Sequence, residues 1–100
     1  MEKIMGYIRG RDLDGIKNNA DAYKYGVPVF FGSSSYRDDI EYIGCIVNHI
    51  RTLFPDIPSS QMFVRKLEKG DTNNYELHTM VYIMLDVDTA KKHSSEYIII

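Results

Sequence analysis

The sequence is poor in cysteine and in long apolar runs. Cys45 is the single cysteine among 100 residues, so no internal disulfide can form and nothing indicates an oxidising compartment. No apolar stretch approaches the ~20 residues of a membrane-spanning helix. The first residues, MEKIMGYIRGRD, lack the apolar run of a signal peptide. We therefore expect a small soluble protein of the cytoplasm.

An excess of charge of one sign is also missing. Twelve basic residues face 14 acidic ones, which gives a net charge of −2 and a pI of about 5.8. This balance is too neutral for a DNA mimic and too acidic for a protein that binds mainly through phosphate contacts. Internal repeats, low-complexity tracts and linkers are absent as well. Residues 1–100 are therefore expected to form one globular domain.

The residues that are present favour a sheet-centred fold. Isoleucine outnumbers leucine 12 to 5, and there are eight tyrosines; β-branched and aromatic residues are typical of strands. We expect strands at about 3–8, 27–31, 62–68, 75–85 and 96–100, and main helices at about 12–25 and 36–54. DTAKKH adds a single helical turn, and the strands at 62–68 and 75–85 are expected to pair as a hairpin. The prediction is an α+β fold in β-α-β-α-β-β-β order, a mixed sheet of about five strands with two main helices.

The longest strand segment, YELHTMVYIML, predicts two apolar faces. One set of alternating positions contains Leu77, Thr79, Val81, Ile83 and Leu85, and the other contains His78, Met80, Tyr82 and Met84. A strand that is apolar on both faces is covered on both. Either one helix packs on each face, or a partner covers the second face.

Methionine, tyrosine and arginine are enriched at protein interfaces. We expect the partner-binding residues to be His78, Met80 and Tyr82, with Tyr36 and Arg37 as an alternative patch. The leading hypothesis is a small protein-binding regulator or inhibitor that acts through a sheet face and associates with itself, most simply as a dimer.

The stretch VFFGSSSYRDD resembles a phosphate-binding loop in outline, because small residues lie between a strand and a helix. Ser33, Ser34, Ser35 and Arg37 would hold the anion. Asp38, however, lies three residues after Ser35, the spacing of a helix cap, and its charge would repel a phosphate. We interpret the loop as a cap and keep a nucleotide- or RNA-phosphate-binding or phosphoester-cleaving module as the alternative function.

Other candidate chemistry is weaker. Asp86 and Asp88 follow the long strand and form the D-x-D spacing that can hold a metal, or they begin a helix, with Asp88 or Thr89 as its cap. His49 falls near the edge of the apolar helix stripe, one turn after Cys45, and is expected to be a core-edge histidine. No residue set forms a catalytic constellation, so we expect no cofactor and lean against an enzyme.

Overall fold

A computed structural model describes residues 4–18, 24, 26–33, 40–67 and 78–100, and the side chains of 67 and 78 lie outside this description. The elements are β1 (Met5–Ile8), α1 (Gly10–Asn18), β2 (Val27–Gly32), α2 (Ile40–Leu53), β3 (Phe63–Leu67), β4 (His78–Leu85), α3 (Val87–His93) and β5 (Ile98–Ile99). Short 3-10 turns, η2 (Ser59–Gln61) and η3 (Ser94–Glu96), precede β3 and β5. The predicted α+β fold and its element order are confirmed.

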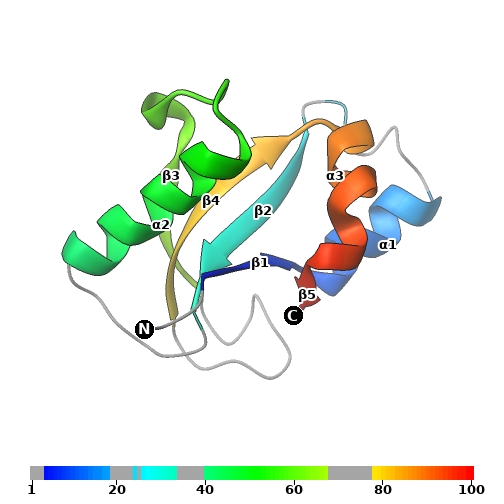
Figure 1. Cartoon of the computed structure of the whole chain (residues 1–100). Helices are drawn as coiled ribbons and strands as arrows, with labels where there is room; N and C mark the ends of the chain where they lie inside the picture. Colours follow the sequence, from blue (N-terminus) through cyan, green and yellow to red (C-terminus); the bar gives the residue numbers. More distant parts are fainter. Residues whose placement is uncertain (1–3, 19–23, 25, 34–39, 68–77) are drawn as a thin grey trace.

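The five strands form one mixed sheet in the order β3-β4-β2-β1-β5. Neighbouring strands are antiparallel except β1 and β5, which run parallel. The β3–β4 pair confirms the expected hairpin, whose connection lies outside the described residues. The segment β1-α1-β2 is not a parallel crossover, because β1 and β2 are antiparallel. Figure 1 shows β5 and the C-terminus at the edge of the sheet opposite β3.

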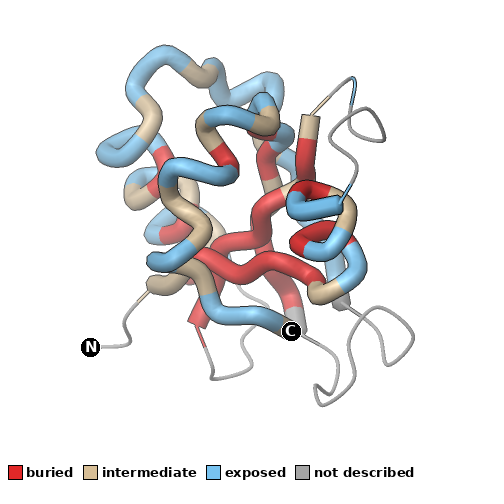
Figure 2. The backbone as a smooth tube through the Cα atoms, turned by 90° about the vertical axis from the view of Figure 1, so that its right-hand side faces the viewer, coloured by how far each residue is buried: buried red, intermediate tan, exposed pale blue. Residues whose placement is uncertain are grey.

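The described helices all pack on the same face of the sheet. Leu13 of α1, Ile46 of α2 and Ala90 of α3 belong to one hydrophobic core, together with sheet residues such as Val29 and Ile83. Figure 2 shows helical turns that alternate between buried and exposed positions, around strands that are buried along much of their length. The described helices therefore do not pack one on each face, as one of the two alternatives expected.

The opposite face carries a second, smaller core. Tyr7, Phe30 and Met80 are at most 1% exposed, and Met5, Tyr82 and Ile100 pack around them. The guanidinium of Arg9 lies 5.3 Å from the centre of the Phe30 ring, a distance at which a cation is attracted to the ring face.

This small core changes the interpretation of Met80. The side chain of Met80 is fully buried within the chain, so a partner cannot contact it without local unfolding. Met80 is a core residue, and we leave it out of the surface proposed below.

Candidate functional sites

An aromatic patch lies on the sheet face opposite the described helices. Strand register places Phe63 of β3 opposite Tyr82 of β4, and Tyr82 opposite Phe30 of β2. The Tyr82 ring lies between the other two, 5.3 Å from the Phe63 ring and 5.5 Å from the Phe30 ring, centre to centre. Such distances are favourable for aromatic pairs.

The exposed part of this face is the surface of interest. Phe63 is 46% exposed and Met84 is 44% exposed, while Tyr82 is half-buried. The exposed side chain of Arg65 shares the face, since successive strand residues alternate between faces. We call Phe63, Arg65, Tyr82 and Met84 the β3–β4 patch. It combines two aromatic rings, a thioether and a guanidinium, all of which are enriched at protein interfaces.

The other residues predicted to bind a partner are not all placed. His78 is the first residue of β4, but its side chain lies outside the description, as do Tyr36 and Arg37. Sequence reasoning overlooked Phe63. The alternation of MFVRKL, which places Phe63 and Arg65 on one face, is the signal that identifies it once β3 is paired with β4.

The described part of the predicted anion loop is already hydrogen-bonded. Ser33 is buried, and its backbone N–H donates to the Tyr42 hydroxyl at 2.9 Å. That N–H therefore has a partner other than a phosphate. Ser34, Ser35 and Arg37 lie outside the described residues, so the predicted cap and the predicted anion contacts both stay predictions.

Asp86 caps helix α3. Its Oδ2 accepts a hydrogen bond from the Thr89 backbone N–H at 3.0 Å, and its Oδ1 accepts one from the Thr89 hydroxyl at 2.7 Å. These two hydrogen bonds hold the pKa of Asp86 below its ordinary value, and the bond from the Thr89 hydroxyl has the larger effect. The expected cap, Asp88 or Thr89, is therefore corrected: the cap is Asp86, two residues before Asp88. Within the described ranges, no three His, Cys, Asp or Glu side chains gather to hold a metal, and Asp88 is simply exposed in the first turn of α3.

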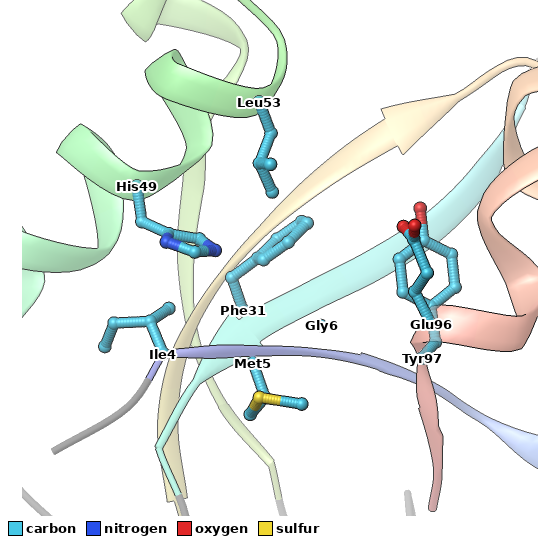
Figure 3. A pocket seen from close by; sticks show the side chains of 8 residues that line it. All are labelled: Ile4, Met5, Gly6, Phe31, His49, Leu53, Glu96 and Tyr97. Atoms are coloured by element: carbon cyan, nitrogen blue, oxygen red, sulfur yellow. The ribbon is translucent and has the colours of Figure 1, made fainter.

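A pocket of about 200 Å³ opens on the helix-covered side, between α2 and the segment from η3 to β5. It is lined by Ile4, Met5, Gly6, Phe31, His49, Leu53, Glu96 and Tyr97. Figure 3 shows His49 and Leu53 reaching down from α2, Phe31 on the floor, and Glu96 with Tyr97 on the far side. The half-buried position of His49, with its ring 6.1 Å from the Phe31 ring, agrees with a core-edge histidine.

Gly6 shapes this pocket. A Cβ at Gly6 would lie 2.7 Å from Cδ1 of Tyr97, closer than any side chain allows. The absence of a side chain in the middle of β1 therefore lets the Tyr97 ring rest on the strand and form one wall of the pocket.

The polar groups of the pocket differ in whether they have a hydrogen-bond partner. Glu96 Oε2 lies 3.0 Å from Nδ1 of His93, an exposed pair on α3 and η3. Burial, with a smaller effect from the Glu96 charge, raises the pKa of Tyr97 to about 12. The Tyr97 hydroxyl is itself buried and has no hydrogen-bond partner among the described residues. A buried polar group without a partner costs stability.

We predict that Tyr97→Phe stabilises the protein by about 1 kcal/mol, because it removes a buried hydroxyl that has lost its water without gaining a partner. Linkage adds a pH dependence. Folding raises the pKa of Tyr97 from 10.0 to about 12. The contribution of the protonated hydroxyl to the free energy of unfolding is therefore fully present below pH 10, and it is lost as the pH rises through about 12. The stability advantage of Tyr97→Phe should therefore widen over that interval. Urea unfolding at neutral and alkaline pH measures both effects; a destabilised Tyr97→Phe would show that the hydroxyl has a partner.

Comparison with known proteins gives no relative. No family model matches the chain, and neither the curated proteins nor the solved structures contain a match to it. Among the helices described here, none has both the length and the apolar character needed to cross a membrane. The features that can indicate a function are therefore the β3–β4 patch and the pocket between α2 and η3.

Proposed function

We propose that this chain is a small protein-binding regulator or inhibitor, and that it docks its partner on the β3–β4 patch. The observation that carries the proposal is the contact between the rings of Phe63, which is 46% exposed, and Tyr82, which is half-buried, on the face opposite the described helices. Large rigid aromatic side chains supply contact area at little entropic cost, and binding energy concentrates in a few such residues.

The first partner we propose is a second copy of the chain, related by a two-fold axis. A two-fold contact brings the same patch against itself, so Phe63, Tyr82 and Met84 would meet apolar groups on the other copy. Stable interfaces bury roughly 800 Å² on each partner, so the contact would extend from the patch along β3 and β4. Arg65, the charged member, would lie at the margin, where water still solvates it.

A cytoplasmic location belongs to the same proposal. It is supported by the single cysteine, Cys45, which is exposed and free of any disulfide. A reducing compartment suits an exposed thiol.

Two neighbouring residues of β3 provide a matched test of the proposed surface. Phe63 belongs to the β3–β4 patch. Val64 pairs with Val81 on the opposite face and is similarly exposed, at 55%. We expect Phe63→Ser to weaken self-association by about 2 kcal/mol or more, the scale of an interface hot spot, and Val64→Ser to leave it nearly unchanged. Sedimentation equilibrium gives the association constants, and circular dichroism confirms that both variants fold.

The comparison also separates a face from an edge. If Phe63→Ser and Val64→Ser weaken association equally, the edge of β3 rather than the face that carries the β3–β4 patch makes the contact, and the proposed surface is wrong. If Phe63→Ser associates as tightly as the unmodified protein, the patch takes no part in the dimer.

A further inference from the structure

The pocket between α2 and η3 has the size of a site for one small molecule. Its volume is about 200 Å³. A protein cavity of about 150 Å³ already accommodates a benzene ring. The pocket therefore has room for a single ring with a short substituent, and not for a nucleotide.

The chemistry of the walls selects the charge of the ligand. Glu96 is the one carboxylate among the described wall residues, and its charge is negative. The aromatic rings of Phe31 and Tyr97 also line the pocket, and cations are attracted to the faces of such rings. No lysine or arginine lies among the described lining residues. These features together favour a cation and disfavour an anion.

His49 adds a directional group. Its ring packs against Phe31, with the ring centres 6.1 Å apart. A neutral imidazole has one nitrogen that accepts a hydrogen bond. An N–H of a ligand that rests on Phe31 would suit this acceptor.

We propose that the pocket binds a small primary ammonium compound with a compact apolar body of about one ring. The ammonium group lies at the carboxylate of Glu96, and the apolar body rests on Phe31 and Ile4. His93 serves as a positioning residue, because its Nδ1 contacts Oε2 of Glu96 and leaves Oε1 for the ligand. This inference is independent of the β3–β4 patch, which lies on the other side of the sheet.

The test is an NMR titration with three molecules of nearly the same shape: benzylamine, benzyl alcohol and benzoate. We expect benzylamine to shift the signals of Phe31, His49 and Tyr97, and to bind about tenfold more tightly than benzyl alcohol, as a charge-assisted contact implies. Benzoate should bind least. Equal affinities for benzylamine and benzyl alcohol, or shifts that do not involve these residues, would overturn the proposal, as would the absence of any binding.

A charge-matched pair of variants tests the role of Glu96. Glu96→Gln should reduce benzylamine affinity to that of benzyl alcohol. Glu41→Gln, which removes an exposed carboxylate from the first turn of α2, should leave it unchanged. If both variants bind benzylamine as the unmodified protein does, Glu96 does not hold the ammonium group.

A second ammonium probe identifies the source of the ligand. Tighter binding of Nα-acetyl-lysine amide than of benzylamine would overturn the proposal of a one-ring ligand and would indicate a lysine side chain of another protein. The reverse order supports a free amine. Phe63→Ser should retain benzylamine binding, so failure of the docking proposal and failure of the pocket proposal give different results.

Discussion

Replacing Met80 with alanine is expected to destabilise the protein by about 2–5 kcal/mol, the usual cost of truncating a fully buried methionine. Met80 is 0% exposed and packs with Tyr7 and Phe30 in the smaller core. The truncation would remove apolar contacts and leave a cavity beneath these two rings. Urea unfolding measures the loss, and many proteins of this size have little more stability than that to lose.

Met84 is the natural control, because it has the same side chain on the same face of the same strand but is 44% exposed. Met84→Ala should change the free energy of unfolding by no more than about 0.5 kcal/mol, as is usual for surface positions. Equal costs for Met80→Ala and Met84→Ala would contradict the assignment of Met80 to a core.

The second large effect is expected at Gly26, where the chain enters β2. Its φ angle is +114°, a conformation that residues with a side chain rarely adopt, and a Cβ would lie 2.9 Å from the Leu85 carbonyl oxygen. Backbone strain of this kind costs about 1–3 kcal/mol, and the contact with a fixed backbone atom adds to it. We therefore expect Gly26→Ala to lower the free energy of unfolding by about 2 kcal/mol or more.

Gly44 provides the opposite case. It lies in α2, and a Cβ there would meet nothing within 4 Å. Gly44→Ala should stabilise the protein by up to about 1 kcal/mol, because alanine loses less backbone entropy in a helix. If both glycine variants are destabilised alike in thermal and urea unfolding, the strain at Gly26 is not the cause.

Local patterns in the sequence predicted most elements of the fold. The three- and four-residue spacing of isoleucines predicted α2. The two strand segments on either side of residues 68–77 predicted the β3–β4 hairpin. The end of α2 at Leu53, just before Pro55, follows from the inability of proline to continue a helix. These features depend on near neighbours, which is why a sequence pattern reveals them.

Burial within one strand face depends on distant neighbours instead. Met80, Tyr82 and Met84 alternate identically in the sequence, yet they range from fully buried to exposed. The difference arises because β1 and β2 bring Tyr7 and Phe30 beneath Met80, whereas Met84 lies opposite Pro28 near the end of β4. Strand order and register decide this, and the sequence pattern alone predicted neither.

The pocket was likewise beyond the reach of sequence patterns. His49 comes from α2, Gly6 from β1, and Glu96 and Tyr97 from the segment before β5. These residues share no spacing or motif. Only the parallel pairing of β5 with β1 brings Tyr97 over Gly6 and opposite His49.

Sedimentation of the unmodified protein across micromolar concentrations is the most direct test of the proposed docking surface. We predict a mass that rises with concentration toward twice the 11.6 kDa of the chain. With Phe63 replaced by serine, we predict a mass that stays near 11.6 kDa. An unmodified protein that sediments only as an 11.6 kDa species at every concentration would contradict the proposal that the β3–β4 patch joins two copies.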